Sequence, residues 1–403
     1  MKHEVLTQIA EKYSTPVYVY DKSVIVNQYR RLDASVEFSP KKIYYASKAN
    51  SNIAILNVFR DLGCSIDVVS PGELFLALKA GFNPSQILFT GNNLAVSEME
   101  YAVEHNVLMT VDSLSQMETY GKINPGSSVC VRINPNLGAG HHRHVITGGL
   151  QSKFGIYYTE INRIRREAER HNLKIIGIHM HIGSGILEYR LLLKGISSLL
   201  DVAAHFAEVE FIDIGGGLGI PYRSEESPLN LEEFGRELTS LVRKWVRMNK
   251  EITLVLEPGR FLVAESGVLL TRVTAVKHNP KYTFVGVDTG FNHFMRPAVY
   301  DAYHEIQLIN NDSRKREIVT VCGNICESGD IFAKKRDLPH LGEGDLLAIE
   351  NVGAYGFSMA SQYNARALPA EVLVDNGNII LIRKRGTFKD FLLNQVYEVD
   401  THE

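Results

Sequence analysis

Cysteine is scarce in this chain. Its 403 residues include four cysteines, Cys64, Cys130, Cys322 and Cys326, and no C-x-x-C pair. Most of them lie far apart and match no zinc-ligand spacing, so neither a metal site nor a disulfide framework is expected. Reduced thiols are typical of a cytoplasmic protein, which is the localisation that we predict.

Long hydrophobic runs and an excess of charge are also absent. No apolar run reaches the roughly 18 residues that a membrane span needs, and the start of the chain, Met1–Leu6, contains no apolar signal core. We therefore expect neither export nor a membrane partner. The formal net charge of -3 and the pI of about 6.5 do not indicate nucleic acid as a partner.

The sequence does contain short apolar runs that alternate with helical patterns. Eight of them are expected to be strands, at residues 43–47, 65–69, 87–90, 108–111, 129–133, 175–179, 210–214 and 252–256. Eight strands that alternate with helices favour an α/β fold, a (β/α)₈ TIM-like barrel, over an open sheet.

The pattern of predicted secondary structure changes after about residue 266. Further β-type runs follow without long helices between them, at residues 268–276, 282–287, 317–321, 345–350, 370–374 and 379–384. They predict a second, mostly β domain, either a sandwich or a barrel. We expect the barrel to span residues 23–266, and residues 1–22 to join 267–403 in the β domain, which would contribute to the active site.

A barrel places its chemistry where the strands end on their carboxyl side. Polar or glycine-rich groups stand at or just past the ends of the eight predicted strands: Lys48, Asp67, Asn92, Asp112, Arg132, His179 with His181, Gly215–Gly217 and Glu257. A lysine at the end of a buried strand has a lowered pKa and can form a Schiff base, although it can also merely extend to solvent. The polar groups at the other strand ends favour the functional interpretation of Lys48.

Three motifs in the barrel region allow a structural and a functional interpretation. Gly215-Gly216-Gly217-Leu218-Gly219 suits an anion nest or simply a tight turn. Glu257 suits a partner for a pyridinium nitrogen or a surface pair with Arg260. His179 and His181 lack a third ligand with matching spacing, so we expect no metal. A ring stacked on a planar cofactor is the better functional interpretation, and a hydrogen-bonded core histidine is the structural one.

The β domain carries its own candidate groups. Cys326 stands beside Glu327, and a thiol with a pKa of about 8.5 can donate a proton near neutral pH, although a cysteine can also be a small buried residue. Tyr355 lies between small residues, so another group could approach its ring. Arg296 suits a carboxylate, or an ordinary surface ion pair.

Taken together, these motifs resemble those of the fold-type III pyridoxal-phosphate decarboxylases, whose barrel is like that of alanine racemase. The matches run in order along nearly the whole chain, from residues 17–20 to 379–383. They comprise residues 45–50 around the lysine, 70–74, 138–142 through 147–149, 152–156, 179–185, 215–217, 257–261, 326–330 and 353–356.

The resemblance implies a role for each matching position. Lys48 would bind the aldehyde of pyridoxal 5'-phosphate, His181 would stack on its ring, and Cys326 would protonate the carbon that loses carbon dioxide. The implied cofactor-binding set is Lys48, Asp67, His181, Ser184, Gly215, Gly216, Gly217, Glu257, Gly259, Arg260 and Tyr355. The implied substrate-binding set is Arg260, Arg296, Tyr300, Glu327 and Tyr355. In the family the thiol and its neighbour reach the lysine of the other subunit, which implies a homodimer with active sites at the subunit interface.

Within this family the motifs are most similar to those of enzymes that convert meso-2,6-diaminopimelate to L-lysine, so we expect that reaction. Ornithine and arginine decarboxylases typically have aspartate at the position of Glu327, and their substrates lack a second carboxylate. Decarboxylases of carboxynorspermidine or of a carrier-bound amino acid remain alternatives, as does a non-catalytic homologue that binds the cofactor. Cys326 argues against an alanine racemase, which would need a tyrosine there.

Overall fold

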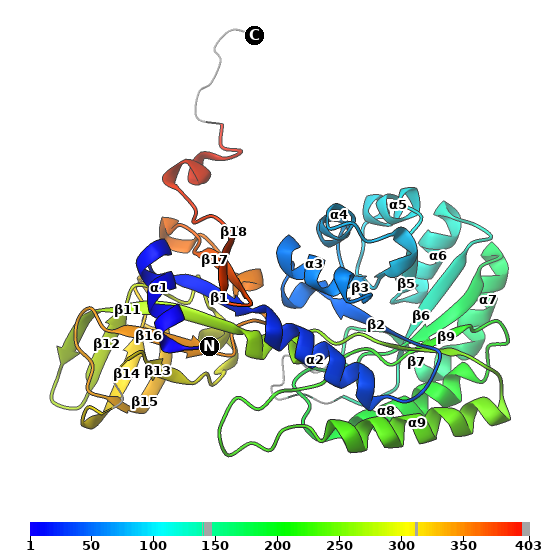
Figure 1. The fold of residues 1–403 in the computed structure, drawn as a ribbon. Coiled ribbons are helices and arrows are strands. Elements are labelled where there is room, and N and C mark those ends of the chain that lie inside the picture. Colours follow the sequence, from blue (N-terminus) through cyan, green and yellow to red (C-terminus); the bar gives the residue numbers. More distant parts are fainter. Residues whose placement is uncertain (139, 141–146, 311–312, 397–403) are drawn as a thin grey trace, which may run out of the picture. The chain divides into compact units, whose positions relative to one another are not determined.

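The computed structural model of the chain describes residues 1–138, 140, 147–310 and 313–396. The chain divides into two compact units, one formed by residues 24–265 and the other by residues 1–23 with 266–403 (Figure 1). No helix within the described ranges is both long and apolar enough to cross a membrane.

The first unit is a closed barrel of parallel strands. In chain order the barrel strands are β2 (Lys41–Ala46), β3 (Ser65–Val68), β4 (Ile87–Phe89), β5 (Leu108–Val111), β6 (Ser128–Asn134), β8 (Lys174–His179), β9 (Phe211–Asp213) and β10 (Thr253–Leu256). Each pairs with the next, β10 pairs with β2, and β5 pairs with β6, which closes the ring. The predicted eight-stranded barrel is therefore confirmed. The short β7 (Ile156–Tyr157), which lies beside β6, was not predicted.

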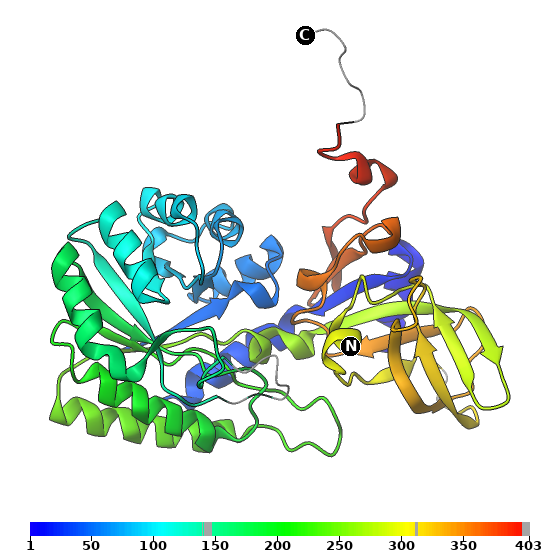
Figure 2. The ribbon, with the colours of Figure 1, turned by 180° about the vertical axis from the view of Figure 1, so that it is seen from behind.

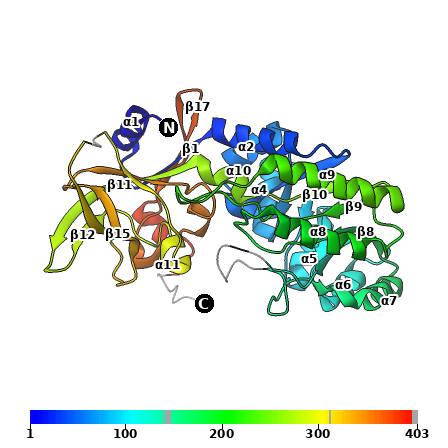
Figure 3. The same ribbon diagram turned by 90° about the horizontal axis from the view of Figure 1, so that it is seen from below.

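Helices cover the outside of the barrel (Figure 2). They are α2 (Lys22–Ser35), α3 (Ile53–Asp61), α4 (Pro71–Lys79), α5 (Val96–Glu104), α6 (Leu114–Ile123), α7 (Ile161–His171), α8 (Tyr189–Ala203) and α9 (Leu231–Met248). The short α10 (Arg260–Val263), which comes soon after β10, is buried along its whole length. Local chemistry sets where α4 begins, since the side chain of Ser70 accepts a hydrogen bond from the Glu73 amide and Pro71 occupies the first turn. Helices α8 and α9 lie side by side (Figure 3), and α9 buries Phe234, Leu238 and Trp245 at helical spacing.

The second unit consists mostly of strands. They are β1 (Val17–Asp21), β11 (Gly267–His278), β12 (Thr283–Val287), β13 (Ile306–Leu308), β14 (Arg316–Cys322), β15 (Ile331–Pro339), β16 (Leu346–Glu350), β17 (Ala370–Asp375) and β18 (Asn378–Arg383), with helices α1 (His3–Tyr13) and α11 (Arg296–Tyr300). Strand β1 lies between β11 and β17, so the start of the chain is part of this sheet. Its core packs alternate residues such as Val17, Val19 and Val268.

Two strands of this unit are absent from the sequence-based prediction. Strand β15 has charged residues along its middle, and its exposed positions there include Lys334 and Lys335. Hydrophobic periodicity therefore does not reveal it, and pairing with β14 holds it in place. Strand β13 has three residues, too few for a periodic pattern.

Candidate active site

Lys48 lies in a short 3₁₀ turn (Ser47–Ala49) that directly follows barrel strand β2. Its Nζ is 2.7 Å from Oδ2 of Asp67, whose side chain is fully buried at the end of the neighbouring strand β3. Burial raises the pKa of Asp67, and the charge of Lys48 opposes that rise. Thr90 donates a hydrogen bond to the other oxygen of Asp67. The lysine is thus held by an ion pair with a buried carboxylate and does not simply extend into solvent.

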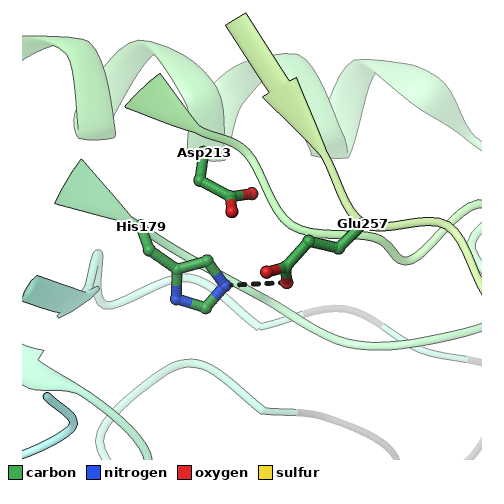
Figure 4. A group of neighbouring side chains, drawn as sticks. All are labelled: His179, Asp213 and Glu257. Carbon is green, nitrogen blue, oxygen red and sulfur yellow. Dashed lines mark hydrogen bonds and ion pairs between the residues drawn. The ribbon is translucent and has the colours of Figure 1, made fainter. Parts of the chain in front are cut away.

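Three neighbouring strands bring His179, Asp213 and Glu257 together (Figure 4). His179 Nε2 is 3.0 Å from Glu257 Oε2, and both side chains are almost completely buried. Burial alone would raise the pKa of Glu257, but the hydrogen bond from His179 and the positive charge of Lys48 outweigh it and lower that pKa. The interpretation of Glu257 as a surface residue is therefore wrong, and the carboxylate is ionised at the barrel centre.

His181 lies on the loop that follows β8. Its Nδ1 accepts a hydrogen bond from the Gly216 amide at 3.2 Å, so in the neutral ring Nε2 carries the proton. Desolvation lowers the pKa of His181, and the charges of Arg132 and Lys48 lower it further. An uncharged imidazole in this position suits stacking on a planar ring.

The loops after β8, β9 and β10 approach one another so closely that side chains would not fit between them. A Cβ on Gly216 would lie 2.3 Å from the carbonyl oxygen of Glu257, and a Cβ on Gly215 would lie 2.2 Å from that of Met180. Gly217 has a φ of +105°, a conformation that L-residues rarely adopt. On the β2 side, a Cβ on Gly259 would lie 3.1 Å from that of Ala49.

Arg260, the first residue of α10, extends towards the loop that follows β8. Its Nε and Nη2 donate to Ser184 Oγ at 3.2 and 3.1 Å, and its Nη1 donates to the Tyr222 hydroxyl at 2.8 Å. Arg260 is buried. A hydroxyl and a guanidinium beside a glycine-rich loop form a set of donors suited to a phosphate group.

The barrel interior also contains an ion pair in which both side chains are buried, and the sequence alone assigned these two residues no role. Arg132 Nη1 is 3.2 Å from Asp112 Oδ1, and the guanidinium lies 4.5 Å from the centre of the Phe154 ring. Asp112 also accepts a hydrogen bond from the Gly155 amide. Their positions at strand ends were the only signal for these two residues, because neither belongs to a local motif.

The candidate residues Cys326 and Glu327 lie in the second unit, in the loop that joins β14 to β15, and both are exposed. The interpretation of Cys326 as a buried apolar residue is therefore wrong. Buried Asp330 shapes this loop by accepting hydrogen bonds from the amides of Ile325 and Phe291, both at 2.7 Å.

A neighbouring turn supports the same two residues. Asn364 accepts a hydrogen bond from the Cys326 amide at 2.8 Å, and the Tyr363 hydroxyl donates to Glu327 at 2.6 Å. No local pattern in the sequence points to Asn364, Tyr363 or the role of Asp330, because their contacts join segments that are distant in the chain or involve backbone amides.

The other predicted residues of the second unit lie on separate elements. Arg296 begins α11 and is buried, with Nη1 2.9 Å from Nε2 of His304, which is at odds with an exposed surface ion pair. Tyr300 ends the same helix, and Tyr355 has a φ of +57° in the loop after β16. Of the loop matched at residues 138–142 and 147–149, positions 139, 141 and 142 fall outside the described residues.

The structure thus gathers the predicted barrel residues at one end of the barrel and the remaining ones in the second unit. The barrel set offers an amine held by a buried carboxylate, a glycine-rich loop with a hydroxyl and a guanidinium beside it, and an ionised carboxylate. The Oε1 atom of that carboxylate, in Glu257, has no hydrogen-bond partner among the described residues. An aldehyde, a phosphate and a ring nitrogen each find a complementary group here, so the residues fit pyridoxal phosphate. Fold and site together define a barrel enzyme that uses this cofactor.

Comparisons with known proteins identify the family. Residues 22–264 match the model for the pyridoxal-binding domain of pyridoxal-dependent decarboxylases. The chain is 45% identical to diaminopimelate decarboxylase of Methanothermobacter thermautotrophicus, covering 96% of this chain and 93% of that one. It is 38% identical to the Escherichia coli K12 enzyme of the same name, covering 96% of each chain.

Solved structures agree with the sequence comparisons. Diaminopimelate decarboxylase from Helicobacter pylori, solved in complex with L-lysine, superimposes with a TM-score of 0.90 at 34% identity, covering 96% of this chain and 98% of that one. The chain belongs to the diaminopimelate decarboxylase family of pyridoxal-dependent decarboxylases.

Proposed function

We propose that this enzyme decarboxylates meso-2,6-diaminopimelate to L-lysine and carbon dioxide, the last step of lysine biosynthesis. The observation that carries the proposal is similarity over nearly the full length of two diaminopimelate decarboxylases, in a chain that has both Lys48 and the Cys326–Glu327 pair. The L-lysine bound in the related Helicobacter pylori structure is the same compound as the product that we propose.

Bound pyridoxal phosphate supplies an aldehyde that captures an amine and a ring that accepts the electron pair left when carbon dioxide departs. We assign the attachment of the cofactor to Lys48, whose amine is already oriented by Asp67. Glu257 keeps a proton on the ring nitrogen, and neutral His181 packs against the ring face. Asp67, Ser184, Gly215–Gly217, Gly259, Arg260 and Tyr355 complete the proposed cofactor site.

The residues on the substrate side are assigned by their charge and by their ability to donate a proton. Cys326 delivers from its thiol the proton that replaces the lost carboxylate. Glu327 binds the distal ammonium group. Arg260, Arg296 and Tyr300 are proposed to bind substrate carboxylate groups, and Tyr355 completes the proposed substrate site. An arginine there distinguishes diaminopimelate from ornithine or arginine, which lack the second carboxylate.

We further propose a homodimer in which Cys326 and Glu327 act at the lysine site of the other subunit. Two features support this arrangement: the Cys326–Glu327 loop is exposed, and the C-terminal segment exposes apolar side chains, with Phe388 84%, Leu393 73% and Val396 89% exposed. Large apolar side chains exposed on one segment suit burial against a partner. The four free cysteines suit the cytoplasmic location that we propose.

The test is a panel of substrates given to the purified enzyme loaded with pyridoxal phosphate. Diaminopimelate should release carbon dioxide and yield lysine, whereas ornithine, arginine and carboxynorspermidine should not. Lys48→Ala should abolish turnover and the absorption band of covalently bound cofactor. Lys42→Ala changes an exposed lysine of the preceding strand β2, and this matched control should behave as wild type. Full activity of Lys48→Ala, or preference for another substrate of the panel, would contradict the proposal.

A further inference from the structure

Two buried carboxyl groups face each other at the centre of the barrel. Asp213 ends β9, and Glu257 directly follows β10, the neighbouring strand in the sheet. Asp213 is 0% exposed and Glu257 is 5% exposed. Figure 4 shows both carboxyl groups beside the ring of His179, and one ligand atom from each of the three residues lies within 4.8 Å of the others. A site this crowded with acceptors needs hydrogen-bond donors.

Among the described residues, two of the four carboxyl oxygens of Asp213 and Glu257 have a hydrogen-bond donor or an ion-pair partner. Asp213 Oδ1 accepts from the Gly215 amide at 2.8 Å, and Glu257 Oε2 pairs with His179 Nε2 at 3.0 Å. The remaining oxygens, Asp213 Oδ2 and Glu257 Oε1, are buried and have no partner among the described residues. Two ionised carboxylates this close would repel each other strongly in a buried site. A single proton between them removes the repulsion and gives both oxygens a partner.

The surroundings decide which group keeps that proton. Burial and then the charge of Glu257 raise the pKa of Asp213 well above its usual value, whereas His179 and Lys48 lower that of Glu257. The nearby lysine and arginine pair with other carboxylates: Lys48 with Asp67, and Arg132 with Asp112. Among the described residues, Glu257 has no lysine or arginine partner, so it is a carboxylate available to a cation of the ligand.

We propose that Asp213 is a positioning residue of the cofactor site, which keeps the shared proton and donates it as a hydrogen bond from Oδ2 to Glu257 Oε1. The donated bond makes Glu257 a weaker base, so a proton between Glu257 and the ring nitrogen stays on the nitrogen. A protonated ring accepts electrons more readily. The inference rests on the proposed function, because it assigns the ring nitrogen to Glu257.

The test compares two substitutions in the loaded enzyme. Asp213→Asn retains a donor towards Glu257 and an acceptor for the Gly215 amide, whereas Asp213→Leu removes both. The primary measurement is the NMR signal of pyridoxal phosphate labelled at its ring nitrogen, which reports protonation directly and does not depend on turnover. Glu257→Gln supplies the reference for an unprotonated ring, and Thr239→Val, a buried hydroxyl on α9, is the control.

We expect the wild type, Asp213→Asn and Thr239→Val to show a protonated ring nitrogen, with cofactor affinities within about threefold of one another. In Asp213→Leu the signal should move to the position seen in Glu257→Gln, and kcat should fall at least about tenfold with little change in KM. If Asp213→Leu does not fold, Asp213→Asn still tests the donor role. Asparagine can donate a hydrogen bond but cannot ionise, so loss of ring protonation in Asp213→Asn would mean that Asp213 acts as an ionised carboxylate.

Several results would overturn the proposal. Protonation unchanged in Asp213→Leu, or lost in Asp213→Asn, would exclude the donor role. One tightly bound divalent cation per chain in the wild type, absent from Asp213→Asn, would instead make His179, Asp213 and Glu257 a metal site. A wild type that binds no pyridoxal phosphate, or releases no carbon dioxide from diaminopimelate, would refute the proposed function and with it this assignment. Normal wild-type behaviour with indistinguishable variants would refute this assignment alone.

Discussion

The proposed sharing of active sites between subunits predicts a specific pattern of complementation. Lys48 belongs to the unit formed by residues 24–265, and Cys326 belongs to the other unit. If each site takes Lys48 from one chain and Cys326 from its partner, two inactive variants should restore activity to each other. The perturbation is co-expression of Lys48→Ala and Cys326→Ala with different affinity tags, followed by isolation of the heterodimer.

The expected magnitude follows from counting sites. A heterodimer of the two single variants has one site with both residues intact and one site with neither, so its specific activity should be roughly half that of the wild type. Homodimers provide the baseline: Lys48→Ala should be inactive, and Cys326→Ala should lose about 100-fold or more in turnover while it retains the cofactor, because an acid catalyst contributes about that much. The assay is release of carbon dioxide from diaminopimelate, scaled to bound cofactor.

A matched heterodimer reverses the expectation. Wild type paired with the chain that carries both substitutions has one site without Lys48 and one without Cys326, so shared sites predict almost no activity. Sites contained within single chains would give the opposite results, about half activity here and almost none for the pair of single variants. That outcome would refute the shared site, and failure to isolate any dimer would refute the homodimer itself.

Two further predictions concern packing and pH. In Gly216→Ala the new Cβ would lie 2.3 Å from the carbonyl oxygen of Glu257. Overpacking of about 1–3 kcal/mol should weaken cofactor affinity, measured by fluorescence titration, at least fivefold. In the control Gly72→Ala the nearest atom is 3.8 Å from the new Cβ, so the affinity should be unchanged. Burial lowers the pKa of His293 to about 4 in the folded protein, whereas an unfolded histidine has a pKa of about 6.5. As the pH falls between these two values, the unfolded state takes up the proton first. The free energy of unfolding therefore decreases, by about 2 kcal/mol at pH 5. In urea unfolding, His293→Gln should lose less stability than wild type between pH 7 and pH 5; equal losses would contradict this role of His293.

Hydrophobic patterning was sufficient to predict the barrel because each buried strand leaves a short apolar run between amphipathic helices. The run at residues 43–47, for example, corresponds to β2 at Lys41–Ala46. The same rule failed for β15, whose middle is charged, and for β13, which has three residues. Both depend on pairing with distant strands, and no local pattern encodes such pairing.

Site residues with a local motif were identifiable from sequence, and those defined by distant contacts were not. Lys48, Glu257 and the glycine-rich loop each stand at the end of a strand, so barrel geometry alone placed them at one end of the fold. Asp330 illustrates the other case: its carboxylate accepts from the Ile325 and Phe291 amides, and the second of these lies 39 residues away.

The sequence by itself was therefore sufficient to predict the eight-stranded barrel and the family and to propose the reactive groups, because strand period, strand-end chemistry and ordered motifs are local properties. Only the tertiary structure decided which charges meet. It paired Lys48 with Asp67 and Arg132 with Asp112 and set Asp213 against Glu257. The physical reason is that ionisation in a buried site depends on distances between strands, and chain closure around the barrel fixes those distances.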